Sequence, residues 1–176
     1  QPKIPSSTIF FLGFSYPYQA IINHKNRHLQ PISLIQTMIT DKKVILASSS
    51  PYRKMLLKKV IPEFTSIAPH VDESPLIEEP PNTLVTRLAR QKAQSIVNNP
   101  EHAQELKRTV IIASDQVAIF NDQILGKPLT ADNAFKQLSC FSGQKVTFLT
   151  SLSLLDCDTH FHKTIIVPFY VHFRHN

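Results

Sequence analysis

The sequence predicts an α/β fold in which a mixed, twisted sheet carries helices on its faces and encloses a central cleft. Short apolar, β-branched runs alternate with helical spacings of apolar residues through the middle of the chain, as in α/β domains. Two long β segments then finish the chain and add further strands. With 176 residues, 42% of them hydrophobic, the chain is long enough to form one sizeable core.

Residues 1–37 are expected to stand apart from this domain, as an upstream extension or a poorly ordered arm. They contain three basic residues and no acidic one, and prolines surround their apolar run at residues 9–14. The chain opens with Gln1, whereas Met38 stands directly before the first strand, so residues 38–176 are predicted to form the domain. No apolar run approaches the roughly 18 residues that a membrane-spanning helix needs. Two cysteines outside any C-x-x-C spacing favour a reducing, cytoplasmic setting.

The first strand is expected at residues 44–47, and it ends at a run of serines. Ser50 is suited to cap a helix with Pro51 at its first position, where the missing N–H costs nothing. A helix start presents free backbone N–H groups and the positive end of the helix dipole. Because residues 52–54 add two basic side chains and an aromatic ring to the first turn, this junction is a candidate anion site.

A second strand at residues 64–68 is expected to lead into a proline-rich acidic loop at residues 69–81. Asn82 is then predicted to cap a long helix with an apolar stripe. Lys92 lies four residues after Leu88, so its side chain starts near the buried side of that helix. Two interpretations stay open for this lysine: it snorkels to solvent, or its ammonium serves a site.

The strongest strand is predicted at residues 109–113, an unbroken apolar run typical of a central strand. Asp115 follows at once, which places an acid at the carboxyl end of that strand, where open α/β sheets bind ligands. The remaining predicted elements are a hairpin over residues 117–120 and 124–125, a helix capped by Thr130, and strands over residues 145–155 and 161–174.

If the strands at residues 44–47 and 109–113 are parallel, the anion site and Asp115 face each other across one crevice. A carboxylate there can bind a hard divalent cation and can orient or deprotonate a water molecule. Arg53, Lys92 and Lys127 would supply the positive charge that phosphoryl transfer requires. Each of these residues also has an ordinary structural interpretation, as part of a cap, a solvated helix turn or a hairpin exit.

Composition excludes some functions and weakens others. Only three glycines occur, so neither G-x-G-x-x-G nor G-x-x-x-x-G-K-[ST] can be written. The net charge of +6 suggests nucleic acid, but half of the excess lies in residues 1–37 and no sustained basic stripe follows. Nucleic acid is therefore not the expected partner.

Six motifs follow one another in a fixed order, and together they cover about residues 43–174. This series resembles the Maf family of nucleotide pyrophosphatases. The motifs are S-S-S-P-Y-R-K, V-D-E-S-P, R-L-A-R-Q-K-A, S-D-Q-V, I-L-G-K-P-L-T and V-P-F-Y-V-H-F-R.

The resemblance implies hydrolysis of a nucleoside triphosphate to the monophosphate and pyrophosphate, with Mg²⁺, Mn²⁺ or Co²⁺ as a cofactor. It also implies a fold similar to that of inosine-triphosphate pyrophosphatases. Lys54 stands where the family usually has arginine, which alone binds phosphate bidentately. The implied roles are catalysis for Asp115, Lys92 and Lys127, phosphate binding for Ser48, Arg53 and Lys54, and metal binding for Glu73 and Asp115.

Two positions resemble the 7-methyl-GTP pyrophosphatase subgroup of this family: Tyr52, directly after the loop proline, and Gln116, directly after the acid. A tyrosine ring stacks well on a positively charged methylated guanine, and a glutamine amide can both donate to and accept from a base edge. The expected partners are a nucleotide substrate and a second copy in a homodimer, without a membrane.

Chains of the family continue beyond the last motif, whereas this sequence ends at Asn176, so a domain without its C-terminal part is expected. The apolar strand at residues 161–174 should then be partly uncovered and prone to self-association. Two alternatives to an active pyrophosphatase remain open: a catalytically inactive remnant that at most binds nucleotides, and a basic module that binds nucleic acid.

Overall fold

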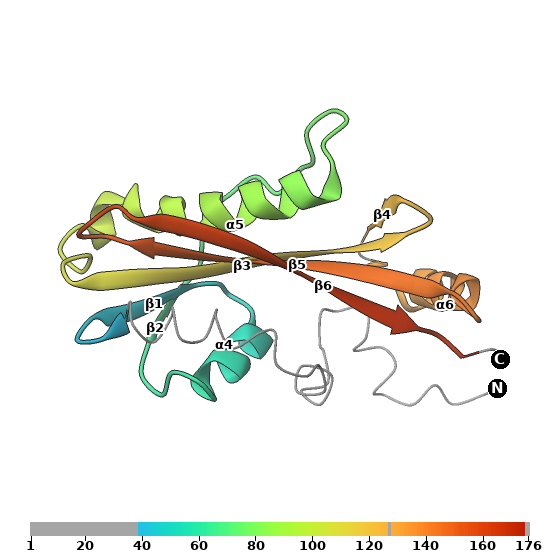
Figure 1. The fold of residues 1–176 in the computed structure, drawn as a ribbon, viewed down its shortest axis with the longest axis horizontal. Coiled ribbons are helices and arrows are strands. Elements are labelled where there is room, and N and C mark those ends of the chain that lie inside the picture. The colour runs from blue at the N-terminus through green and yellow to red at the C-terminus, as the bar shows by residue number, and fades with distance from the viewer. Residues whose placement is uncertain (1–38, 127, 175–176) are drawn as a thin grey trace.

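A mixed six-stranded sheet organises the protein in the computed structural model, which describes residues 39–126 and 128–174. The strand order is β2-β1-β3-β5-β6, and β4 pairs with β3 beside this path. Figure 1 shows the twist of this sheet. The strands are β1 (Lys43–Ala47), β2 (Thr65–Ile67), β3 (Thr109–Phe120), β4 (Gln123–Leu125), β5 (Lys145–Asp156) and β6 (His162–His172). The helices are α4 (Pro51–Lys58), α5 (Pro81–Val97), the short 3-10 helix η1 (Pro100–His102) and α6 (Ala131–Cys140).

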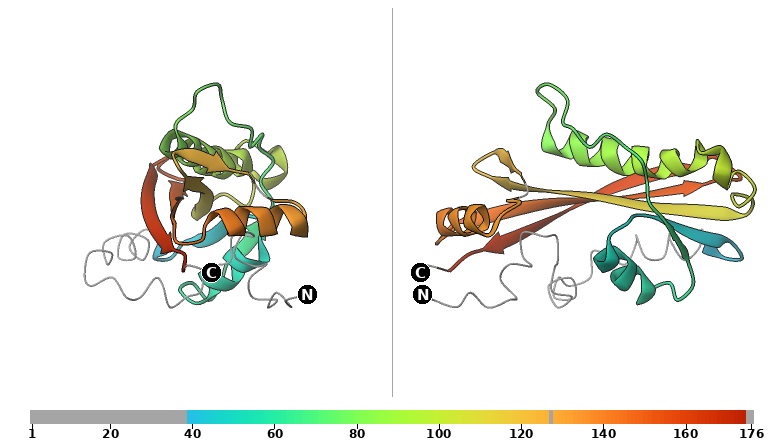
Figure 2. Two further views of the ribbon diagram at one scale, coloured as in Figure 1. Left: turned by 90° about the vertical axis from the view of Figure 1, so that its right-hand side faces the viewer. Right: turned by 180° about the vertical axis from the view of Figure 1, so that it is seen from behind.

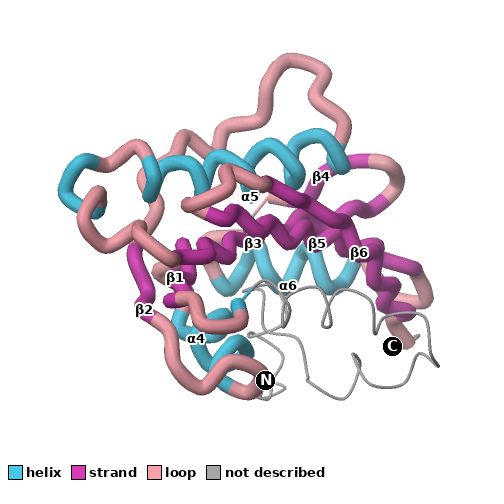
Figure 3. Tube along the Cα trace, turned by 60° about the vertical axis from the view of Figure 1, so that its left-hand side comes forward, coloured by secondary structure: helices cyan, strands magenta, loops and turns pink. Residues whose placement is uncertain are grey.

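Within the described residues, α4, α5 and α6 cover the two faces of the sheet. Helix α5 lies along one face, and α4 and α6 lie on the other (Figure 3). The buried side chains alternate accordingly: Ile111 of β3 packs with Ile96 of α5, whereas Ile112 packs on the opposite side, with Ile61 after α4. The predicted fold class, a mixed α/β sheet with flanking helices, is therefore confirmed.

Pairing in the sheet is parallel on one side and antiparallel on the other. β1 is parallel to both β2 and β3, which confirms the condition under which the serine-rich junction and Asp115 share a crevice. β5 runs antiparallel to β3 over ten register pairs, and β6 continues the antiparallel pairing to the edge. Figure 2 shows β4 at the end of the sheet that lies away from β1 and β2.

Helix starts follow the predicted chemistry in two of three cases. Ser50 caps α4 with Pro51 at the first position, and Thr130 caps α6 by accepting from Asn133 N–H. The prediction that Asn82 caps α5 is wrong, because Pro80 holds the cap position and the helix begins at Pro81, two residues before the predicted start. Proline is favoured at a first helical position, where its missing N–H would have no partner. The residues between β2 and α5, 68–80, are called the acidic loop below.

Asp115 departs from its predicted place at the carboxyl end of a strand. β3 runs without interruption from Thr109 to Phe120, so Asp115 lies within the strand. The physical reason is that β5 continues to pair with β3 as far as Ile119.

Among the described residues, no helix is long and apolar enough to cross a membrane.

Residues 1–37 and Met38 lie outside the described residues. The division into an extension and a domain from residue 38 therefore stays a prediction, as does self-association through the last strand.

Candidate active site

The middle of β3 has a neighbouring strand on only one of its two edges. On one edge, β1 pairs with β3 up to Ala113, and β4 resumes pairing at Ala118. On the other edge, pairing with β5 continues past Asp115, whose register partner is Ser151. The described part of the sheet thus has a gap beside residues 114–117, and Asp115 lies in it.

A cavity of about 740 Å³ occupies this gap. It brings together segments that are far apart in the sequence: the end of β1, the acidic loop, α5, the middle of β3 and the start of α6. Its polar and charged lining residues include Ser48, Ser49, Ser50, Arg53, Glu73, Lys92, Asp115, Gln116 and Thr130. The structure therefore joins six of the predicted site residues in one cavity.

Lys92 lies between two carboxylates at the wall of the cavity. Its Nζ is 2.6 Å from Asp115 Oδ1 and 2.7 Å from Glu73 Oε1. The side chains of Lys92 and Asp115 are 6% and 8% exposed, whereas that of Glu73 is 52% exposed. The ammonium of Lys92 therefore does not snorkel to solvent. That it serves a site stays a prediction.

Burial dominates the electrostatics of Asp115. It raises the pKa of this carboxyl above the ordinary value, although the positive charges of Lys92 and Arg53 act in the opposite direction. The nearby negative charge of Glu73 raises the pKa further. Asp115 is therefore a stronger base than a surface aspartate, and it can accept a proton from a bound water more readily.

The serine-rich junction forms the opposite wall. Ser50 Oγ accepts from Arg53 N–H at 3.4 Å, and Ser48 Oγ accepts from Ser50 N–H at 3.1 Å. Ser66 fixes the same segment from β2 by donating to the Ser48 carbonyl at 2.7 Å. Burial lowers the pKa of the Arg53 guanidinium, and the charges of Asp115 and Glu73 partly offset this effect. A fixed turn, a helix start and a guanidinium suit the binding of phosphate oxygens.

Gln116 reaches the cavity from the other face of β3. Successive side chains of a strand alternate, so Asp115 points to the α5 side and Gln116 to the side of α4 and α6. Gln116 Nε2 lies 2.5 Å from Thr150 Oγ1 on β5, which fixes the amide. The carbonyl oxygen and the second N–H of this amide can form hydrogen bonds with a base edge.

Three predicted residues are not placed at the cavity. Tyr52 is half-buried and Lys54 is exposed, and neither is among the lining residues. Lys127 lies outside the described residues. The roles predicted for these residues stay predictions.

Glu73 and Asp115 are the residues that could hold a divalent cation. Among the described residues, no cluster of three or more His, Cys, Asp or Glu side chains could bind a metal. Mg²⁺ in phosphate-processing sites is commonly held by one or two carboxylates together with substrate phosphates. Two carboxylates beside the turn at residues 48–53, for which phosphate binding is predicted, fit that donor set.

Ser151 is a site neighbour that no sequence pattern singles out. It is fully buried on β5, and its Oγ donates to the Val85 carbonyl of α5 at 2.6 Å. The same Oγ accepts from Asp115 N–H at 3.3 Å. Ser151 thus connects the strand that carries Asp115 to the helix that carries Lys92.

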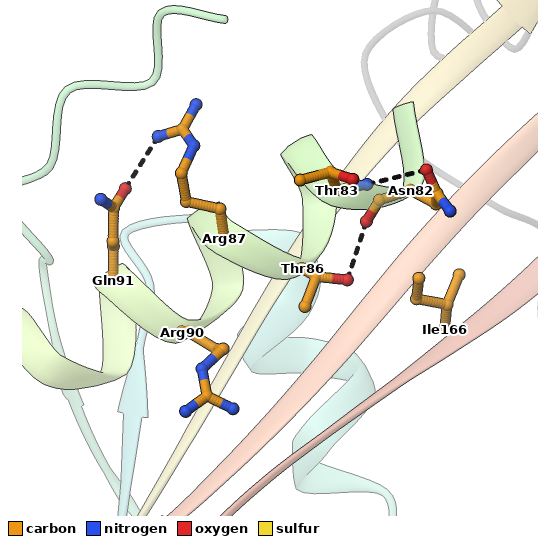
Figure 4. A pocket seen from close by; sticks show the side chains of 7 residues that line it. All are labelled: Asn82, Thr83, Thr86, Arg87, Arg90, Gln91 and Ile166. Atoms are coloured by element: carbon orange, nitrogen blue, oxygen red, sulfur yellow. Dashed lines mark hydrogen bonds between the residues drawn. The ribbon is translucent and has the colours of Figure 1, made fainter. Parts of the chain in front are cut away.

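A second cavity, of about 510 Å³, lies between α5 and β6 and shares no lining residue with the first. Figure 4 shows its lining side chains, which include Thr86, Arg87 and Arg90 on the helix and Ile166 on β6. The lining contains no carboxylate, so this cavity lacks the acid that hydrolysis would need.

A protein family and several known proteins are similar to most of this chain. The family model described as Maf-like protein matches residues 43–176. The "7-methyl-GTP pyrophosphatase" of Aliivibrio fischeri is 46% identical over 76% of this chain and 66% of its own length. The protein of the same name from Pseudoalteromonas translucida is 47% identical over 74% of this chain and 62% of its own length. The chain thus spans less than two thirds of these relatives. The solved Staphylococcus aureus Ham1 protein is 15% identical, with a TM-score of 0.49 over 74% of this chain and 71% of its own.

Proposed function

This chain belongs to the Maf-like protein family, and on that premise we propose that it hydrolyses 7-methyl-GTP, or a related modified nucleotide, to the monophosphate and pyrophosphate. The observation that carries the proposal is the buried Lys92, which bridges Asp115 and Glu73 opposite the turn at residues 48–53. The names of the relatives support the choice of nucleotide.

In the proposed reaction, the turn at residues 48–50 and Arg53 bind the phosphate oxygens through N–H groups and a guanidinium. Asp115 accepts a proton from water as the water oxygen attacks the α-phosphorus. The bond from that phosphorus to the bridging oxygen of the β-phosphate breaks, and pyrophosphate leaves with the bond electrons. Lys92 keeps Asp115 and Glu73 in place and adds positive charge near the phosphates.

A divalent cation held by Glu73 and Asp115, such as Mg²⁺, Mn²⁺ or Co²⁺, would neutralise part of the charge on the phosphate oxygens. Lys127 is proposed to add a second cationic contact. Tyr52 and Gln116 are proposed to select the base, by stacking and by hydrogen bonds respectively. A cytoplasmic location and a homodimer are part of the same proposal.

The test is a release assay for inorganic pyrophosphate with 7-methyl-GTP, GTP, dTTP and UTP, each with Mg²⁺ and with EDTA. We expect pyrophosphate, stoichiometric with the monophosphate, from 7-methyl-GTP in preference to the others. Release of inorganic phosphate instead, or full activity in EDTA, would contradict the proposal. Nucleotide binding without hydrolysis would favour the inactive remnant, and strongly salt-dependent binding to RNA or DNA would favour the nucleic-acid module.

A further inference from the structure

Glu73 lies in an exposed loop, yet it contacts a buried ammonium group. It sits in the acidic loop, where residues 72–78 are all exposed, and its own side chain is 52% exposed. Its carboxylate nevertheless meets the buried ammonium of Lys92 at 2.7 Å. An exposed loop has many accessible conformations, so holding one carboxylate at this distance requires fixed points close to it in the chain.

Arg87 of α5 supplies two such fixed points. Its guanidinium forms a bidentate pair with Glu79, with Nε 2.7 Å from Oε1 and Nη2 2.7 Å from Oε2. Nη2 also donates to the backbone carbonyl of Ser74 at 3.0 Å. Ser74 directly follows Glu73, so one side chain holds the loop both next to the functional carboxylate and near its end.

The loop closes on itself around the same contact. Leu76 N–H donates to Glu79 Oε2 at 3.0 Å, and Glu79 N–H donates to the Leu76 carbonyl at 3.1 Å. On the other side of Glu73, Asp72 Oδ1 accepts from Ser74 N–H at 2.9 Å. Arg87 therefore binds a segment that is already folded into two short turns.

The ion pair between Arg87 and Glu79 persists at neutral and mildly acidic pH. The hydrogen bonds from Arg87 lower the pKa of Glu79 to about 2, so Glu79 stays ionised at neutral and mildly acidic pH. The Glu79 side chain is 3% exposed, which protects the pair from competing water. Bidentate pairs between arginine and a carboxylate also fix geometry better than a lysine contact does.

Arg90, one turn further along α5, provides a matched comparison. Both arginines line the second cavity, and Figure 4 shows that their side chains extend in different directions. Arg87 donates to Gln91 in addition to its loop contacts, whereas Arg90 is exposed.

We propose that Arg87 is a positioning residue, which holds Glu73 beside Lys92 by fixing the Ser74 carbonyl and the Glu79 carboxylate. This inference rests on the proposed pyrophosphatase activity. Arg87 itself contacts neither Lys92 nor Asp115 in the hydrogen bonds and ion pairs of the described chain. The charge of Arg87 acts on Asp115 only through space, whereas its contacts hold the loop beside Glu73. We therefore expect its effect on turnover to pass mainly through Glu73.

A double-mutant cycle tests this dependence. Arg87→Ala and Glu73→Gln are measured for pyrophosphate release alone and together, with Arg90→Ala as the control. If Arg87 acts through Glu73, Arg87→Ala lowers kcat/KM in the parent but adds little to the loss in the Glu73→Gln protein. Arg90→Ala stays close to the parent. Equal losses from Arg87→Ala in both backgrounds would overturn the proposal, because a general effect on folding is additive.

Amide hydrogen exchange gives a readout that needs no activity. Arg87→Ala should speed the exchange of amides in residues 72–79 by about tenfold or more, since hydrogen bonds to a charged group are lost. The control Arg90→Ala should leave these amides unchanged. Exchange in residues 72–79 that is the same in Arg87→Ala as in the parent would overturn the proposal.

Two further variants keep the test decisive if Arg87→Ala folds poorly. Glu79→Gln removes the other half of the pair and should reproduce both effects. Arg87→Lys keeps the positive charge but cannot form the bidentate pair with Glu79. Its kcat/KM and its exchange rates should therefore lie between those of the parent and of Arg87→Ala. If the parent chain releases no pyrophosphate, the proposed function fails, and hydrogen exchange alone decides whether Arg87 holds the acidic loop.

Discussion

Two lysines of this protein each bridge two carboxylates, at different places beside β3. Lys92 lies between Asp115 and Glu73 in the gap of the sheet. Lys42 lies just before β1, with its Nζ 2.6 Å from Asp156 Oδ2 and 3.2 Å from Asp158 Oδ2. The two clusters contain the same types of charge, yet the pKa of Asp115 is raised, whereas those of Asp156 and Asp158 are lowered.

The difference comes from what else contacts the acids. Burial works against the ionised form of Asp156, but hydrogen bonds from Lys42 and from the backbone N–H groups of Asp158 and Thr159 lower its pKa overall. The backbone N–H of Arg108 lowers the pKa of Asp158. For Asp115, burial prevails and the pKa is raised. Backbone donors thus make the Lys42 cluster a structural clamp, whereas Asp115 keeps its basicity.

The largest expected effect separates the two clusters by activity. Asp115→Asn should lower turnover by about 10²-fold or more, because the amide cannot accept the proton from water. Asp156→Asn should leave turnover close to the parent value. Both are measured as pyrophosphate release at saturating 7-methyl-GTP. A similar loss in both variants would show that the two clusters do not differ in function.

For stability, in contrast to activity, we expect the larger effect from the Lys42 cluster. Asp156→Asn should lower the free energy of unfolding by about 1.5–3 kcal/mol, the usual contribution of hydrogen bonds to a charged group. Asp158→Asn should have a smaller effect, because its side chain is 36% exposed. Urea denaturation measures both values. No loss in Asp156→Asn would mean that the Lys42 cluster is not a clamp.

Two buried serines on β5 sharpen the comparison at smaller magnitude. Ser151 contacts Val85 and Asp115, whereas Ser153, two residues along the same face, contacts His162 and Thr164. Replacing either serine by alanine should cost about 1 kcal/mol of unfolding free energy. Only Ser151→Ala should also lower kcat. Equal kcat values in the two variants would show that Ser151 does not position the site.

The pH dependence of stability should carry opposite signs in the two clusters. The lowered pKa of Asp156 means that its stabilisation is present above the ordinary value of about 3.9 and is lost as the pH falls through the folded-state pKa. The raised pKa of Asp115 means that its contribution is present at low pH and is lost as the pH rises through the folded-state pKa. On acidification, the free energy of unfolding of the parent should fall relative to that of Asp156→Asn. Relative to that of Asp115→Asn, it should rise. Urea denaturation at neutral and acidic pH checks both signs.

Local signals in the sequence predicted much of the site, since capping chemistry and apolar spacing act over a few residues. Ser50 and Thr130 cap their helices as predicted, and Lys92 lies on the buried side of α5. The family resemblance was needed for Glu73, because an acid in an exposed loop has no spacing that marks it.

Contacts between distant segments were not predictable in this way. Lys42 and Asp156 are 114 residues apart, and no periodicity connects them. The contact of Arg87 with the Ser74 carbonyl depends on the path of the acidic loop, which its own turns determine. The position of Asp115 within β3 depends on how far β5 continues to pair, which the apolar run at residues 109–113 does not encode.

The gap in the sheet also has a mechanical consequence. β5 pairs with β3 along most of its length, but no strand of the described chain pairs with the other edge of β3 at residues 114–117. A sheet bends more easily where a strand has a neighbour on one edge only. Bending of the sheet about this point would change the separation between Ser48 at the end of β1 and Ala134 on α6, which lie on the lining of one cavity. A ligand that contacted both residues would therefore resist this bending.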